Sequence, residues 1–325
     1  MPRLAIGLDL GGTQVRAALV DEGGYIQARA AVATAAAAGP EIVIDQLHWV
    51  AEAVSTGVPA ADLAGIGVAA PGPLDTGTGT ALGLPTLAGF VDLPLARLLA
   101  ERFDRPVRLE NDGIAAALGE WRFGAGRGHA NLVYVTVSTG IGGGVVSDGR
   151  LLRGRRGMAG HVGHMTIMRD GAPCSCGHRG CWEAYGAGPA FARRAREQAA
   201  RTPGTQLAGP IDARAVFEAA AAGDALAAAL VAEEADILGL GIAGLLHLYS
   251  PEIVIVGGGV AHGFPALHPG IAARIRTAAM APFRDVPVVR AALGDNAGLV
   301  GAAALAFEVV GDEIRTPLPL GEGQG

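Results

Sequence analysis

Three cysteines and a histidine lie close enough in the sequence to bind a metal ion. Cys174, Cys176 and Cys181 are the only cysteines of the chain, and His164 precedes the first of them by ten residues. Three thiolates and one imidazole form a closed tetrahedral zinc site with no open position for a reactant. We therefore expect a structural Zn²⁺ in a reducing compartment, and no secreted disulfide framework.

This interpretation leaves alternatives for the cysteines and for two neighbouring side chains. The cysteines could be buried and free, and His161 or His178 could replace His164 as the fourth ligand. Glu183 follows the last cysteine by two residues. If a metal fixes the loop, the Glu183 carboxylate can accept hydrogen bonds from ligand hydroxyl groups. Otherwise it is a solvated surface glutamate.

Glycine-rich turns follow strand-like segments at three places. Glycines let backbone amides approach an anion closely, a threonine hydroxyl adds a donor, and a carboxylate at a strand end can hold hydrated Mg²⁺. Each turn could instead be an ordinary glycine hairpin, but together they predict phosphate loops for ATP and Mg²⁺. The residues concerned are Asp9, Gly11, Gly12, Thr13, Thr139, Gly140, Gly142 and Gly258.

Asn111 and Asp112 lie between a strand-like segment and a helical one. Either residue could simply cap the helix N-terminus, where Asn and Asp are common. Alternatively, Asp112 could accept the proton of an attacking hydroxyl while Asn111 holds a neighbouring hydroxyl. Phosphoryl transfer needs little more than positioning, charge neutralisation and such a carboxylate.

Composition and charge exclude several classes of protein. The 325-residue chain contains no lysine, which excludes a Gly-Lys-Ser/Thr phosphate loop and the protein-kinase fold. The net charge is −6 and the arginines are scattered, so we expect no nucleic-acid partner. The apolar run at 237–246 is about half a membrane span, so we expect a buried helix there. A strand begins near residue 4, so we expect no signal peptide and a cytoplasmic protein.

The elements that position these residues repeat along the chain. A strand–turn–strand unit occurs at 4–20 and again at 132–148, which predicts two related α/β halves that face a cleft. Further strands are expected at 25–34, 65–71, 106–112, 252–259 and 287–293. Helices are expected at 41–54, 93–102, 114–123, 189–201, 212–222, 224–248, 266–281 and 297–309, followed by a loose tail from 316.

Taken together, the motifs resemble the ROK family of sugar kinases and repressors within the actin-like ATPase superfamily. The resemblance extends over DLGGT at 9–13, APGP at 70–73, LEND at 109–112, STGIGGG at 138–144, GHVGH at 160–164, CSCGHRGCWE at 174–183 and GGG at 257–259. It implies an α/β, two-lobed, actin-like (ribonuclease H-like) fold with a cleft between the lobes. The smaller lobe would comprise 1–115 and about 300–325, and the larger lobe 116–299, with the zinc-binding loop at 160–183.

The resemblance also implies ATP-dependent phosphorylation of a hexose, usually at its 6-hydroxyl, by a homodimer or homotetramer. The short apolar run described above gives the separate expectation of no membrane partner. Asp112 matches the catalytic base. The positions that match or border the sugar site are Gly72, Thr86, Asn111, His161, His164 and Glu183.

Two departures from the family pattern bear on the substrate. His161 stands where the family usually has a glutamate, and Thr86 stands where it often has an asparagine. A neutral imidazole accepts only one hydrogen bond. Some N-acetylmannosamine kinases look similar in carrying His-x-Gly-His, so glucose and N-acetylmannosamine are both leading substrates.

Two other functions remain as alternatives. A sugar-responsive repressor of this family would carry a winged-helix segment before the first strand, and the strand expected near residue 4 leaves no room for one. A non-catalytic sugar-binding protein would not need Asp112 or two phosphate loops.

Overall fold

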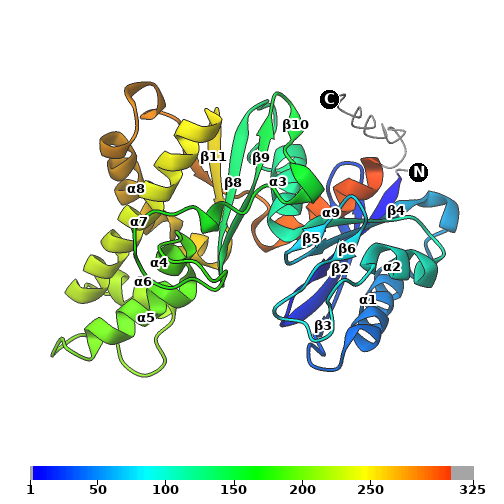
Figure 1. Ribbon diagram of the computed structural model, residues 1–325, viewed down its shortest axis with the longest axis horizontal. Coiled ribbons are helices and arrows are strands. Elements are labelled where there is room, and N and C mark those ends of the chain that lie inside the picture. The colour runs from blue at the N-terminus through cyan, green and yellow to red at the C-terminus, as the bar shows by residue number, and fades with distance from the viewer. Residues whose placement is uncertain (1–2, 309–325) are drawn as a thin grey trace, which may run out of the picture.

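Two five-stranded sheets, each covered by helices on its outer face, form the frame of the molecule (Figure 1). The computed structural model describes residues 3–308. The strands are β1 (Leu4–Leu10), β2 (Gln14–Asp21), β3 (Ile26–Ala33), β4 (Leu63–Ala70), β5 (Leu74–Asp75), β6 (Thr80–Ala81), β7 (Val107–Asn111), β8 (Leu132–Val137), β9 (Ile141–Ser147), β10 (Arg150–Leu151), β11 (Ile253–Gly257) and β12 (Val288–Arg290). The helices are α1 (Pro40–Ser55), α2 (Leu95–Phe103), α3 (Asp112–Phe123), α4 (Glu183–Gly186), α5 (Gly188–Ala199), α6 (Ala213–Ala221), α7 (Ala225–Tyr249), α8 (Phe264–Ala278) and α9 (Ala297–Glu308).

The two sheets have the same strand arrangement. The first sheet runs β3-β2-β1-β4-β7 and the second runs β10-β9-β8-β11-β12. In each, a hairpin pairs the first long strand with its successor, and two further strands add in parallel on the other side. The repeated strand–turn–strand unit expected from the sequence is therefore confirmed. The carboxyl ends of the parallel strands carry the turns that were predicted to bind ligands.

Helices α3 and α9 lie between the two sheets (Figure 1). Helix α9 packs on β1 and β4 of the first sheet, α3 packs on β9 of the second, and the two helices pack on each other. Small residues permit this close approach. A methyl group at Gly67 would lie 1.8 Å from the carbonyl oxygen of Ala302, and one at Gly301 would lie 1.7 Å from that of Ala115. The many glycines and alanines thus allow the two sheets and the helices between them to pack closely.

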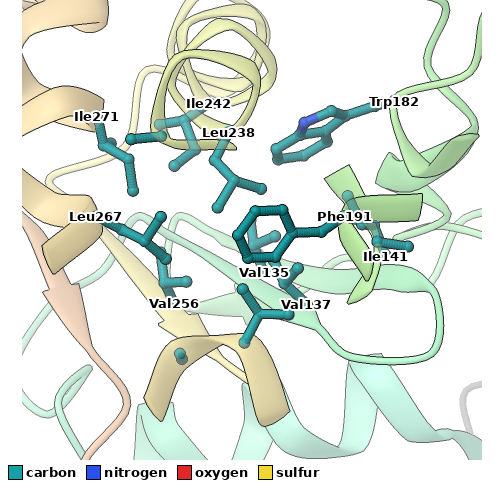
Figure 2. Close-up of a cluster of buried hydrophobic side chains, with 14 of the residues drawn as sticks. Val135, Val137, Ile141, Trp182, Phe191, Leu238, Ile242, Val256, Leu267 and Ile271 are labelled. Atoms are coloured by element: carbon teal, nitrogen blue, oxygen red, sulfur yellow. The ribbon is translucent and has the colours of Figure 1, made fainter. Parts of the chain in front are cut away.

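The larger hydrophobic core lies between the second sheet and helices α5, α7 and α8. Figure 2 shows the Trp182 indole in this core near Leu238, Ile242 and Phe191. The Trp182 ring is fully buried, and its Nε1 donates to the carbonyl oxygen of Ile237, 3.1 Å away. Because Trp182 follows Cys181 directly, this core holds one end of the cysteine loop.

The element predictions agree closely with the structure, and the helix expected over 237–246 forms part of α7, with most of that segment buried. Within residues 3–308, no helix has both the length and the apolar character to cross a membrane. The proposed lobe boundary at 115/116 falls inside α3, and the division into lobes stays a prediction. The tail expected from 316, and the part of the smaller lobe at 309–325, lie outside the described residues.

Replacing Gly241 by alanine should destabilise the protein by about 1–3 kcal/mol, the range of an overpacked core. The new methyl group would lie 2.1 Å from Cε2 of Trp182. The matched control is Gly298→Ala in α9, where nothing lies within 4 Å of the added methyl. We expect that control to be neutral or to stabilise by up to about 1 kcal/mol. Urea unfolding measures both; equal effects in the two variants would contradict the packing described for Trp182.

Candidate active site and metal centre

The four predicted metal ligands come together in the structure. One ligand atom each from His164, Cys174, Cys176 and Cys181 lies within 4.8 Å of the others. Sγ of Cys174 is 3.6 Å from Nδ1 of His164, and Sγ of Cys176 is 3.7 Å from Sγ of Cys181. In a regular tetrahedron, Zn–S bonds of about 2.3 Å and a Zn–N bond of about 2.1 Å require separations of about 3.8 Å (S···S) and about 3.6 Å (S···N). The donor set therefore fits a closed zinc site.

His164 is the histidine of this set. Within residues 3–308, neither His161 nor His178 belongs to the group. Since Nδ1 of His164 faces Cys174, its Nε2 remains available to another partner. The ring centroids of His161 and His164 are 6.2 Å apart, so the metal loop adjoins the site that His161 borders.

Glu183 joins the cysteine loop to the second glycine turn. Its Oε1 accepts the Ser175 hydroxyl at 2.9 Å, and its Oε2 accepts the backbone amide of Ile141 at 3.0 Å. A methyl group at Gly140 would lie 2.5 Å from that Oε2, so only glycine leaves room for the carboxylate. The predicted ligand-binding glutamate is thus held from both sides and is not a freely solvated surface residue.

Gly72, Asn111 and His161 meet although they are far apart in the sequence. A methyl group at Gly72 would lie 3.0 Å from Cε1 of His161 and 3.4 Å from Nδ2 of Asn111. Burial and, next, the neighbouring His164 lower the pKa of His161. Its imidazole is therefore neutral at pH 7 and offers one acceptor and one donor.

Asn111 is the N-cap of α3, as one of the two interpretations expected. Its Oδ1 accepts the amides of Gly113 at 3.0 Å and Ile114 at 3.4 Å. Its Nδ2 is the atom that faces Gly72. Capping and ligand binding therefore use different atoms of the same amide, so the two roles do not compete.

Asp112 is the first residue of α3 and is open to solvent on one side. Protein atoms nevertheless surround it at longer range. This desolvation is the main reason why the pKa of Asp112 rises to about 6; the Gly113 amide opposes the rise and the Asp9 carboxylate adds to it. A carboxylate with a pKa near 6 is still ionised at pH 7 and is a stronger base than an ordinary aspartate.

Asp9 is held by an arginine that the sequence analysis missed. Nε and Nη2 of Arg16 both donate to Oδ2 of Asp9, the former at 3.0 Å, and Nη1 of Arg16 donates to the carbonyl oxygen of Asp295. The β1–β2 hairpin places Asp9 opposite Arg16, so a register prediction from the turn could have found the pair. Both contacts use Oδ2, which leaves Oδ1 as the oxygen that fits hydrated Mg²⁺.

The other predicted residues of the first sheet lie around the Gly11-Gly12 turn. The amide of Gly11 donates to the carbonyl oxygen of Gln14 at 3.0 Å and closes the turn. Thr86 lies directly over Gly12, where an added methyl would be 2.9 Å from its Oγ1. Thr13 and Thr86 are exposed. The structure therefore brings Thr86 to the predicted phosphate turn.

The second phosphate turn and the third glycine cluster are neighbours on the second sheet. A methyl group at Gly258 would lie 2.7 Å from Oγ1 of Thr136 and 2.5 Å from the carbonyl oxygen of Val137. Gly258 has a φ of 84°, which favours glycine there. Thr139 and Gly140 form the turn, whereas Gly142 lies in β9 opposite Thr136. The role of Gly142 as a ligand-binding residue stays a prediction.

Two sheets of the same topology with a pair of helices between them define the actin-like ATPase fold. A sequence model of the ROK family matches residues 5–309. The chain belongs to the ROK family.

Named relatives match nearly the whole chain. A glucokinase from Thermotoga maritima is 37% identical over 96% of this chain and 100% of the relative. An N-acetylmannosamine kinase from Escherichia coli O157:H7 is 35% identical over 93% of this chain and 97% of the relative. The crystal structure of a ROK family glucokinase from Streptomyces griseus in complex with glucose and AMPPNP superposes with a TM-score of 0.84. It is 37% identical, and the match covers 94% of this chain and 99% of that one.

Proposed function

We propose that this protein is an ATP-dependent sugar kinase that phosphorylates the 6-hydroxyl of a hexose or an N-acylhexosamine. The observation that carries the proposal is that the first sheet brings Asp9 and Asp112 to the same edge: Asp9 pairs with Ala69 of β4, and Ala69 pairs with Glu110 of β7, two residues before Asp112. One site then contains a carboxylate suited to hydrated Mg²⁺ and a second carboxylate suited to take a proton. The glucokinase and N-acetylmannosamine kinase relatives support the same chemistry.

In this proposal, the chain's own residues divide the work between the sugar and the nucleotide. Asp112 accepts the proton of the attacking sugar hydroxyl, and Nδ2 of Asn111 holds a neighbouring hydroxyl. His161, Nε2 of His164 and Glu183 orient the sugar ring. The turns at 12–13 and 139–140 offer backbone amides to the phosphates of ATP, Gly11 closes the first of these turns, and Gly258 borders the nucleotide.

Two metals fit the residues in different ways. Asp9 would hold Mg²⁺, which when bound neutralises phosphate charge. The His164–Cys174–Cys176–Cys181 set would hold zinc in a closed site, where it fixes the loop and supplies no open position for chemistry. The zinc would act on the sugar only through the positions of His164 and Glu183.

Glucose and N-acetylmannosamine are the two leading substrates. The relatives include kinases named for each sugar. His161 stands near Gly72 and Asn111, and a neutral imidazole there makes fewer hydrogen bonds than a carboxylate would. We also propose assembly as a homodimer or homotetramer, which light scattering measures.

An ADP-release assay over glucose, mannose, fructose, N-acetylglucosamine and N-acetylmannosamine tests the proposal. We expect turnover with at least one of these sugars, and highest kcat/KM for glucose or N-acetylmannosamine. Product analysis by phosphorus NMR should place the phosphate on the 6-hydroxyl. Absence of turnover with all five sugars in the presence of ATP, Mg²⁺ and zinc-replete protein would overturn the kinase proposal.

A further inference from the structure

Glu110 is a buried carboxylate directly before the two residues proposed to hold and activate the sugar. It is 1% exposed. Its Oε1 accepts the backbone amide of Asn111 at 3.0 Å, and its Oε2 accepts Nε of Arg153 at 3.0 Å. The carboxylate therefore fixes the corner at which β7 ends and α3 begins. None of the roles proposed above for ATP, sugar or metal uses it.

Arg153 reaches Glu110 from the other sheet. It follows β10, at the edge of the second sheet, and it begins the segment that leads to His161. The carbonyl oxygen of Arg153 accepts the amide of Ala159 at 3.0 Å, so the residue also shapes that segment. One guanidinium thus connects the strand before Asn111 with the loop that carries His161.

A second, exposed layer of charge lies outside this pair. Nη2 of Arg153 is 3.3 Å from Oε2 of Glu308 at the end of α9, and Nη2 of Arg122 is 3.8 Å from Oε1 of Glu308. The Glu110 side chain is 2% exposed whereas that of Glu308 is 34% exposed. Removal of Arg153 should therefore destabilise the protein far more through Glu110 than through Glu308. The Glu110 carboxylate would stay buried without a counter-ion.

We propose that Glu110 and Arg153 are positioning residues for phosphoryl transfer: their ion pair holds Asn111 and Asp112 of the first sheet in register with the His161 segment of the second. The inference rests on the proposed sugar kinase activity. Burial raises the pKa of Glu110, and Arg153 is the main group that opposes the rise. Without Arg153 the carboxyl group binds a proton or turns toward water. Either change frees the corner that presents Asp112.

Arg153→Met should lower kcat by roughly 10- to 100-fold, because a misplacement of about 1 Å at the reacting atoms can cost about 100-fold. The KM for ATP should stay within about twofold of the wild-type value, since the side-chain hydrogen bonds that the pair makes within residues 3–308 go to Asn111 and Glu308 and not to either phosphate turn. Arg153→Lys should restore part of kcat. In a double-mutant cycle, Glu110→Gln with Arg153→Met should be no slower than the slower single variant. Steady-state kinetics with the best sugar of the panel measures wild type and the four variants.

A chemical-rescue experiment separates positioning from general destabilisation. Arg153 and Glu308 line an open cavity of about 1070 Å³, so truncation of the Arg153 side chain should open a path from this cavity to the Glu110 carboxylate that Arg153 contacts. Millimolar guanidinium should therefore raise the kcat of Arg153→Ala several-fold and leave wild type and Asp112→Asn unchanged. Sodium at equal ionic strength should not rescue.

Two control substitutions use the same region of the chain. Arg155 is exposed two residues farther along, and Glu308 is the outer partner of Arg153. Arg155→Ala and Glu308→Gln should each retain kcat within about threefold, because Arg155 is exposed and Glu308 is only half-buried, so that solvent screens both charges. If wild type is active and Arg153→Met has an unchanged kcat, the positioning role is wrong and the proposed function stands. Additive losses in the double-mutant cycle would lead to the same conclusion. A wild type that turns over no sugar would overturn the proposed function and this inference with it.

Discussion

Replacing Asp112 by asparagine should lower kcat by about 10³- to 10⁴-fold, toward the upper range for removal of a general base. The substitution keeps the size of the side chain and removes the atom that would accept the proton. Oδ1 of Asn111 caps the amides of Gly113 and Ile114. Oδ1 of Asp112 also accepts the Gly113 amide at 2.7 Å, and the side-chain oxygen that remains in Asp112→Asn can still accept it, so α3 should still form. Sugar binding, measured by calorimetry, should therefore survive within about threefold. ADP release measures the loss of turnover.

The pH profile gives an independent check on the same residue. A base must be ionised to work, so kcat/KM of the wild type should fall with a slope of one as the pH drops through about 6, the raised pKa of Asp112. That limb should be missing from the residual activity of Asp112→Asn. If the variant instead loses folding and sugar binding together, the carboxyl group supports structure and the assignment as base is wrong. An acidic limb near pH 4 in the wild type would contradict the raised pKa.

Replacing Cys181 by serine should remove the bound zinc and lower kcat/KM for the sugar by about 100-fold. Cys181 is 1% exposed, pairs with Thr166 across a β-bridge and precedes the buried Trp182. Loss of its thiolate leaves three ligands, and metal binding is coupled to the order of the loop. The loop carries Glu183, so the sugar site should lose its fixed carboxylate. The KM for ATP should change much less than the KM for the sugar.

Metal analysis and a neighbouring substitution complete this test. Wild-type protein should contain about one zinc per chain, and Cys181→Ser much less. His178→Ala is the matched control, because His178 lies in the same loop, is exposed and is outside the ligand group. It should retain both zinc and activity. A zinc-free wild type with full activity, or loss of zinc from His178→Ala, would refute the proposed ligand set.

Much of the fold could be predicted from local sequence patterns. The glycine turns between strand-like segments predicted the repeated hairpins, and the alanine-rich segments predicted α5 to α7 within a few residues. The packing of α9 was harder to foresee, because its fit depends on glycines in other elements. Gly67 in β4 leaves room for the carbonyl oxygen of Ala302, and no local pattern links those two positions.

The candidate site also has a part that could be predicted from local sequence and a part that depends on tertiary packing. His164 and the three cysteines were predictable because closely spaced ligands in one loop need only local turns to meet. His161 was singled out as the residue that bears on the sugar, but its contact with Gly72, 89 positions away, depends on the packing of the two sheets. The Asp9–Arg16 pair was within reach through hairpin register, whereas the Glu110–Arg153 pair was not.

The sequence by itself determined the chemical inventory of this protein: a closed thiolate–imidazole set, glycine turns able to meet phosphate, a carboxylate at a helix start and no lysine. These features depend only on residue types and on short separations along the sequence, so they can be recognised without knowing how the chain folds. Only the tertiary structure decided which groups from the two sheets face each other. Packing of α3 and α9 between the sheets buries charged groups. A buried charge without a partner lowers the stability of the fold, so opposite charges from the two sheets lie together. Glu110 and Arg153, 43 residues apart, are joined for that physical reason.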